Sequence, residues 1–224
     1  MRKGYCEFDL HGHTKYSAFP TTINYSPEDV VIRAKEVGLD GIAITGHDTI
    51  KGLDEGLNSA IKHGLIVIPG IEITSRIGSK TPHILALGIA PDDICRSKYK
   101  IPRYKDPCEV IAWIHDFGGV AIAAHPSKRW LYTSLSYKQV IKYHDIIDGI
   151  EVITAHGQDE QLEVIAKESN IAGLGCSDFH SLDEIGLAVT RVFGQVSNYE
   201  DVLQAIKEKK VKAFSQTNEQ YSKF

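Results

Sequence analysis

Cysteine is scarce in this 224-residue sequence, and its four cysteines form no paired CxxC motif. The spacing therefore predicts neither a disulfide framework nor a cysteine-based zinc site, and a reduced, cytoplasmic setting is expected. Long apolar runs are also missing, so no membrane-spanning segment is expected. The first four residues, Met-Arg-Lys-Gly, lack the apolar stretch that a secretory leader requires, so none is expected.

Neither sign of charge is in large excess. The chain has 25 Lys and Arg against 29 Asp and Glu, which gives a net charge of -4. This balance predicts no global attraction to nucleic acid or to an anionic membrane and leaves only local patches to consider. A hydrophobic content of 42% and a charged content of 24% are ordinary for a globular protein. One domain over residues 1–224, with a sizeable core, is expected.

Strand and helix patterns alternate along the chain, which is typical of an α/β fold. Apolar runs predict strands at 5–8, 41–45, 65–73, 83–88, 120–124, 147–153, 171–176, 192–193 and 211–214. Helical periodicity and capping signals predict helices at 26–38, 49–63, 106–117, 137–143, 158–169 and 198–209. The segment 90–106 has no clear period. Because candidate functional residues recur at strand ends, a TIM-like barrel with its site at the C-terminal ends of the strands is predicted.

The segment Asp9-Leu-His-Gly-His-Thr14 follows the first predicted strand. Side chains alternate between the faces of a strand, so Asp9, His11 and His13 are expected on one face. Two imidazoles at a strand end can bind one divalent metal, although paired histidines also occur at surfaces without one. A metal site here therefore requires matching ligands at other strand ends.

Matching ligands do follow. Six of the ten histidines and two acids fall at predicted strand ends: His11, His13, His47, Glu72, His83, His125, Asp178 and His180. The segment between Glu72 and His83 is too short for a helical crossover, so a hairpin is expected to bring these two residues together. Histidine plus carboxylate is the ligand set of zinc, manganese or iron sites that hydrolyse esters. The other histidines are expected to be structural or solvated, although the last of them also follows a strand: His63, His115, His144 and His156.

A basic segment lies in the aperiodic region. It contains Arg96, Lys98, Lys100, Arg103 and Lys105, together with Tyr99 and Tyr104. Two interpretations stay open: a solvated surface loop, or a clamp for a substrate phosphate.

Six segments, taken in order, resemble the signature motifs of the PHP family, which is named for polymerase and histidinol phosphatase. They are Asp9-Leu-His-Gly-His-Thr14, Ile44-Thr-Gly-His-Asp-Thr49, Pro69-Gly-Ile-Glu72, His83-Ile-Leu-Ala-Leu-Gly88, Ala124-His-Pro126 and Ser177-Asp-Phe-His180. Each segment is a weak signal alone, but the ordered set spans nearly the whole chain. The resemblance implies a distorted (β/α)7 barrel that hydrolyses phosphoesters with two or three divalent metal ions and a hydroxide held between them.

The resemblance also implies how the metals are shared among these residues. His11, His13 and Asp178 would hold a first metal. Glu72 would bridge to a second metal, which His83 and His125 complete. His47 and His180 would hold a third.

Five neighbouring residues have expected roles as well. Asp9 is expected to orient an imidazole through its N–H, the alternative being an ordinary strand-end acid. Asp48 is expected either to shuttle a proton or to support a ligand from outside the site. Glu151 is expected either to orient a ligand or to be a plain buried acid. Lys128 and Arg129, which follow the fifth motif, are expected to bind a substrate phosphate, the alternative being surface charge.

Two departures from the family pattern affect the third metal. Many relatives carry an acid where this chain reads Ser17-Ala18-Phe19. Many also read Thr-Asp-His-Asp where this chain has Thr45-Gly46-His47-Asp48. The third site therefore lacks its expected anionic ligand, and it is weak, empty or completed by Asp48.

Other functions remain open at this point. An amidohydrolase-like barrel that cleaves C–N bonds also opens with His-x-His, but it commonly bridges its metals with a lysine where this chain has Glu72. A non-catalytic, metal-stabilised module is consistent with the altered third site. The substrate is left open between a phosphorylated small molecule and a short oligonucleotide, and the metal between zinc, manganese and iron.

Overall fold

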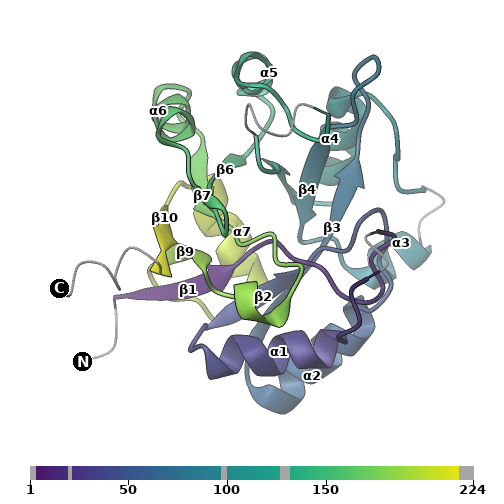
Figure 1. The fold of residues 1–224 in the computed structure, drawn as a ribbon, viewed down its shortest axis with the longest axis vertical. Coiled ribbons are helices and arrows are strands. Elements are labelled where there is room, and N and C mark those ends of the chain that lie inside the picture. The colour runs from purple at the N-terminus through teal and green to yellow at the C-terminus, as the bar shows by residue number, and fades with distance from the viewer. Residues whose placement is uncertain (1–3, 20–21, 97–99, 127–131, 217–224) are drawn as a thin grey trace.

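The structure is a computed structural model that describes residues 4–19, 22–96, 100–126 and 132–216 (Figure 1). Within these residues the strands are β1 (Tyr5–Asp9), β2 (Gly41–Ile44), β3 (Ile66–Thr74), β4 (His83–Leu87), β5 (Val120–Ala123), β6 (Gly149–Thr154), β7 (Gly157–Gln158), β8 (Ala172–Gly175), β9 (Ala188–Phe193) and β10 (Val211–Ser215). The helices are α1 (Pro27–Glu36), α2 (Leu53–His63), α3 (Pro91–Arg96), α4 (Pro107–Asp116), α5 (Tyr137–Tyr143), α6 (Glu160–Glu168) and α7 (Tyr199–Lys207).

The strands form one curled sheet in the order β10-β9-β1-β2-β3-β4-β5-β6-β7, with β8 paired to β6. β1, β2 and β3 are parallel neighbours, and so are β5, β6 and β8, whereas β4 is antiparallel to both β3 and β5. The expected distorted α/β barrel is confirmed. The sheet has ten strands in place of seven, because β7, β9 and β10 add antiparallel pairs to it.

The barrel nearly closes where β8 meets β9. The side chain of Thr190 accepts a hydrogen bond from the Gly175 N–H (3.2 Å) and donates one to the Gly175 carbonyl (2.9 Å). A Cβ at position 175 would lie 2.3 Å from the Val189 carbonyl oxygen, so only glycine allows the two strands to approach this closely.

The apolar core divides into groups on the two sides of the sheet. One group joins inward-facing residues such as Phe8 and Ala43 to α7. A second group packs Ile42 and Ile44 of β2 against α1 and α2, as the alternation of small and bulky residues predicts. A third group lies between β3 to β6 and helices α4, α5 and α6. Helices α1, α2, α4, α5 and α6 therefore cover the outside of the barrel, whereas α7 packs against the inward-facing group (Figure 1).

Most helix boundaries follow their predicted caps. Ser26 and Asp29 form a reciprocal capping box at the start of α1, and Pro27 occupies its first turn. The prediction for α2 was wrong at its start, since Gly52 has a left-handed backbone (φ 87°) and the helix begins after it. The short α3 was not predicted. Among the described residues, no helix is both long enough and apolar enough to cross a membrane.

Candidate metal centre

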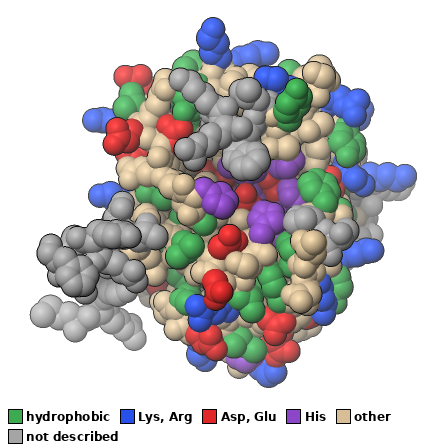
Figure 2. Space-filling view, in the orientation of Figure 1, with side chains coloured by type: hydrophobic (Ala, Val, Ile, Leu, Met, Phe, Trp, Pro, Cys, Tyr) green, Lys and Arg blue, Asp and Glu red, His purple; other side chains and the backbone are tan. Residues whose placement is uncertain are grey.

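Eight side chains meet at one end of the barrel, and they are the eight that the sequence predicts: His11, His13, His47, Glu72, His83, His125, Asp178 and His180. Most of them follow the ends of parallel strands. His83 is the first residue of antiparallel β4, so it lies at the same end. Figure 2 shows histidines gathered around a hollow at the centre of one face, with acidic side chains among them.

Glu72 lies at the centre of this cluster and is fully buried. Five imidazole nitrogens lie close to its carboxylate: His83 Nδ1 (2.7 Å) and His125 Nε2 (3.1 Å) near Oε1, and His47 Nδ1 (2.9 Å), His11 Nε2 (3.2 Å) and His13 Nε2 (3.3 Å) near Oε2. The predicted hairpin is present, because β3 and β4 pair with Thr74 opposite His83. Burial raises the pKa of Glu72, but the surrounding imidazoles outweigh it and hold that pKa well below its usual range.

Several polar atoms of the cluster are buried without a hydrogen-bond partner in the described part of the chain. They are His11 Nε2, His47 Nδ1, Glu72 Oε2 and His83 Nε2. Buried polar atoms are almost always paired, so this set requires an explanation. Imidazole and carboxylate donors that converge on shared space are suited to divalent transition metals. These residues therefore fit metal ions as the missing partners.

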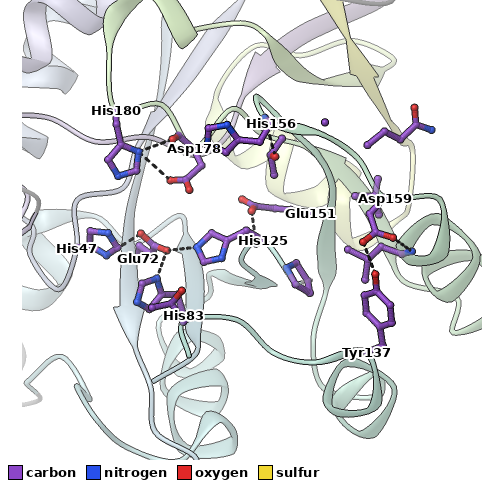
Figure 3. A pocket seen from close by; sticks show the side chains of 17 residues that line it. His47, Glu72, His83, His125, Tyr137, Glu151, His156, Asp159, Asp178 and His180 are labelled. Carbon is purple, nitrogen blue, oxygen red and sulfur yellow. Dashed lines mark hydrogen bonds and ion pairs between the residues drawn. The ribbon is translucent and has the colours of Figure 1, made fainter. Parts of the chain in front are cut away.

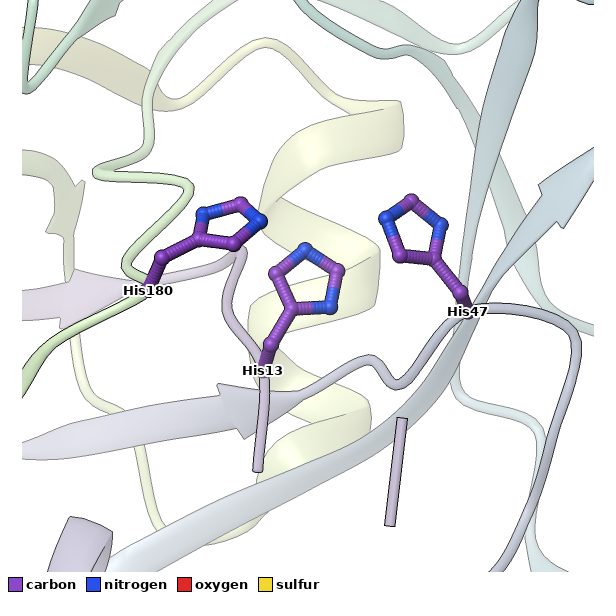
Figure 4. Close-up of side chains that lie close together, drawn as sticks. All are labelled: His13, His47 and His180. Carbon is purple, nitrogen blue, oxygen red and sulfur yellow. The ribbon is translucent and has the colours of Figure 1, made fainter. Parts of the chain in front are cut away.

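The donor atoms fall into three overlapping groups, each with its atoms within 4.8 Å of one another: His11, His13, Glu72 and Asp178; His47, Glu72 and His83; and His13, His47 and His180. The first group contains the residues expected around the first metal. The second contains Glu72 and His83 as expected, but it has His47 in place of the expected His125. The third adds His13 to the expected pair (Figure 4).

The third group contains no carboxylate. Ala18 and Gly46 stand where the family pattern has acids, and the ring of Phe19 stacks on His47 with its centroid 4.1 Å away. This group is therefore the least suited to hold a cation tightly.

Three residues outside the cluster fix the orientation of its imidazoles. Glu151 is buried, with Oε1 2.7 Å from His11 Nδ1, and its Oε2 accepts the backbone N–H of His125 (2.6 Å). Ser17 Oγ lies 3.1 Å from His13 Nδ1, and Ser134 Oγ lies 3.2 Å from His125 Nδ1. Of the two roles considered for Glu151, these contacts favour the orienting one. Apart from their short distance from a motif, nothing in the sequence indicated that these two serines contact histidines of the cluster.

The surrounding charges act differently on the first two histidines. Burial lowers the pKa of His11, but Asp178, Glu151 and Glu72 outweigh burial and raise that pKa well above its usual value. At His13 burial dominates, and the pKa falls to about 4. His13 is therefore neutral at physiological pH and keeps a lone pair for a metal.

Residues 9–218 match the family model described as PHP domain. The chain belongs to the PHP family. An uncharacterized protein from Methanocaldococcus jannaschii is 32% identical over 167 residues, which are 70% of this PHP chain and 87% of that protein. This confirms the resemblance that the ordered motifs indicated.

Two further relatives bear on the fold and the chemistry. A two-domain protein from Bacteroides vulgatus, described as containing a predicted PHP-like metal-dependent phosphoesterase, superposes with a TM-score of 0.77 at 20% identity. The match covers 95% of this chain and 66% of that one, and it shows the shared fold. The 3',5'-nucleoside bisphosphate phosphatase of Chromobacterium violaceum is 35% identical over 83 residues, which are 37% of this chain and only 28% of that enzyme.

Of the two roles expected for Asp9 beside the PHP site, its contacts favour that of an acid at a strand end. Its Oδ1 accepts the Ser177 N–H (2.9 Å) and its Oδ2 accepts the Gly186 N–H (3.0 Å). The reason is that the chain after β8 passes beside the end of β1, where Gly12 and Phe179 form a parallel bridge. Burial raises the pKa of Asp9 to about 6, against these backbone donors. Asp9 therefore links the end of β1 to the segment that follows β8.

Asp48 likewise has contacts other than those expected. Its Oδ1 accepts the Thr74 N–H (2.9 Å), its Oδ2 accepts the Thr74 hydroxyl (2.8 Å), and Arg103 Nε lies 3.4 Å from Oδ2. Asp48 belongs to none of the three donor groups, so the structure gives no support to its completing the third site. Its carboxylate fastens the turn after β2 to the end of β3.

Replacing Asp48 with Asn should therefore affect stability more than turnover. Asparagine tolerates the left-handed backbone at this position (φ 53°) but loses one charged acceptor, which lowers the free energy of unfolding by about 1.5–3 kcal/mol. Denaturant unfolding and steady-state kinetics measure the two effects, with the exposed Asp145→Asn as control. A large fall in kcat at unchanged stability would instead support a role for Asp48 as a proton shuttle.

The remaining predicted residues lie elsewhere. Lys128, Arg129 and the basic residue Lys98 fall outside the described residues. His63, His115 and His144 contact Glu28, Asp148 and Asp145 respectively, as structural or surface histidines do. His156 differs, because it lines the cavity that opens over the metal centre.

Proposed function

We propose that this PHP domain is a metal-dependent hydrolase of phosphoesters. The observation that carries the proposal is the convergence of five imidazoles on the buried carboxylate of Glu72, with several donor atoms left unpaired. Sites built from histidine and carboxylate around more than one metal are suited to in-line displacement at phosphorus. Relatives described as phosphatase and phosphoesterase support the same reaction class.

We assign the metal ligands as follows. His11, His13 and Asp178 hold the first ion, Glu72 bridges to the second, His83 and His125 complete the second, and His47 and His180 contact a third. When bound, these ions supply Lewis acidity that neutralises the non-bridging oxygens of the substrate and lowers the pKa of water.

The residues around the ligands hold them in position. Glu151 accepts from His11 Nδ1 and thereby leaves His11 Nε2 facing Glu72. Ser17 does the same for His13, whose Nε2 faces Asp178 (3.0 Å). Because these imidazoles are oriented before any ligand binds, little reorganisation is needed when negative charge develops on the substrate.

The substrate class follows from the site and from the named relatives. A terminal phosphate can reach metals at the bottom of an open hollow, whether it belongs to a nucleotide, another phosphorylated metabolite or a short oligonucleotide (Figure 2). The nucleoside bisphosphate phosphatase supports a nucleotide among these candidates.

A substrate panel on purified protein of known metal content tests the proposal. It should contain phosphomonoesters, phosphodiesters, short oligonucleotides and an amide substrate, each with and without chelator. We expect turnover of a phosphoester that chelator abolishes and that added zinc, manganese or iron restores. Turnover of the amide alone would indicate a C–N hydrolase, and no turnover by metal-loaded protein would indicate a binding module.

The third ion is expected to be weakly held, because its group of three histidines contains no carboxylate. Dialysed protein should retain about two metal ions per chain, and the variant His180→Ala should retain the same number. Elemental analysis gives the stoichiometry, and anomalous scattering gives the positions. A third transition metal at full occupancy in dialysed wild-type crystals would contradict this expectation.

A further inference from the structure

The cavity over the metal centre extends well beyond it. Its volume is about 970 Å³, and the ligands His47, Glu72, His83 and His180 lie at one end (Figure 3). The other end, here named the side arm, is lined by Tyr137, Val152, Thr154, Gln158, Asp159 and Leu162 of α5, β6, β7 and the start of α6, and His156 lies between it and Asp178 (Figure 3). A phosphate group alone is much smaller than this space, which is of the size that pockets for nucleotide-sized ligands have.

The hairpin between β6 and β7 holds His156 at the wall of this cavity. The Ala155 N–H donates to the Ser177 carbonyl (3.3 Å), which ties the turn to the residue before Asp178. The His156 N–H donates to Thr154 Oγ1 (3.2 Å), and Gly157 closes the turn with a φ of 131°. His156 is therefore held on the same side of the cavity as Asp178 (Figure 3).

The carboxylate in the wall of the side arm is already engaged in hydrogen bonds. Asp159 Oδ1 caps α6 by accepting the N–H groups of Gln161 (3.1 Å) and Leu162 (3.2 Å), while Oδ2 accepts the hydroxyl of Tyr137 (2.5 Å). Gln158 donates to Glu163 (2.8 Å). Among the described residues, the imidazole of His156 makes no hydrogen bond, so it is available to a ligand.

We propose that the side arm binds the leaving group of the substrate and that His156 contacts it directly. The inference rests on the proposed phosphoester hydrolysis, since the phosphate at the metal end directs the rest of the substrate into the arm. The lining combines the edges of Val152 and Leu162, which are otherwise buried in the core, with hydroxyl, amide and imidazole groups. Such walls match a leaving group with a flat apolar part and hydroxyls, as a nucleoside has, better than an alkyl chain.

Two ligands distinguish binding at the metal end of the cavity from binding in the side arm. Inorganic phosphate reports on the metal end alone, whereas adenosine 5'-monophosphate reports on both ends. In His156→Ala we expect the KM for the nucleotide to rise on the order of tenfold, as the loss of one hydrogen bond predicts, with the inhibition constant of inorganic phosphate unchanged. His156→Gln, which keeps a donor, should recover part of the loss. The exposed His144→Ala is the matched control.

Binding of a non-hydrolysable adenosine phosphonate, measured by calorimetry on metal-loaded protein, tests the side arm without turnover. Weaker phosphonate binding in His156→Ala, with phosphate binding unchanged, supports the proposal even if no phosphoester is hydrolysed, in which case only the proposed function fails. An equal loss of affinity for both ligands would place His156 at the metal end and contradict the proposal. Unchanged affinity for both ligands, together with normal hydrolysis of a small phosphomonoester, would contradict the proposal as well.

Discussion

Replacing Glu72 with Ala should release bound metal and lower phosphoester turnover by at least about a hundred- to a thousand-fold, the loss seen for a single electrostatic contact to a transition state. The effect should be large because one carboxylate serves both ends of the cluster. Its Oε1 faces His83 and its Oε2 faces His11 and His47. Without it the imidazoles keep their places on separate strands but lose the anion that we propose bridges two cations.

Elemental analysis and steady-state kinetics on the same preparation measure both consequences. Glu72→Gln keeps the size and one oxygen, so it separates the loss of charge from the loss of volume in the core. The exposed Glu36→Ala is the control for removing an acid. Circular dichroism should show a folded protein. Near-normal turnover in Glu72→Ala with its metal retained would end the bridging assignment.

Replacing Glu151 with Ala should weaken metal binding by about 10- to 100-fold, because partners of metal ligands typically have effects of this size. The carboxylate contacts a ligand of each of the first two proposed ions, His11 through its side chain and His125 through its backbone. The left-handed backbone of His125 (φ 33°) is unfavourable for a non-glycine residue, and its N–H is held by this carboxylate. Both ions should therefore be affected together.

Competition with a chelator of known affinity gives the metal dissociation constants of wild type and variant. Glu151→Gln can still accept from one partner, so its loss should be smaller. If Glu151→Ala melted at a lower temperature but bound metal with wild-type affinity, Glu151 would be a buried acid of the fold and nothing more.

Local rules predicted much of this molecule. Alternation along strands predicted which side of β2 faces the helices, and the shortness of the segment before His83 predicted the hairpin that brings it to Glu72. The predicted start of α2 was wrong, because residues 51–52 form a turn in which Gly52 has a left-handed backbone, and the helix begins only at Leu53.

The partners of the ligands could not be predicted in the same way. Asp9 and Glu151 are both acids in strands that lead to the site, but Glu151 reaches His11 while Asp9 reaches backbone donors after β8. Which acid meets an imidazole depends on which strands are neighbours across the barrel, and a single sequence does not contain that information. The same holds for Ser17, and for His156, whose position depends on the contact of its hairpin with Ser177.

The bridge between Gly12 and Phe179 has a consequence for how the protein is made. His13 and Asp178 are 165 residues apart, and the backbone of His13 donates to Phe179 (3.1 Å). The proposed first site therefore forms only after Asp178 has been synthesised and two segments 165 residues apart have met, which is a slow, long-range step. An ion that binds the closed barrel and not the open chain shifts folding by mass action. Bound metal would then stabilise the closed barrel, and the supply of metal during expression would govern the fraction of the protein that is folded.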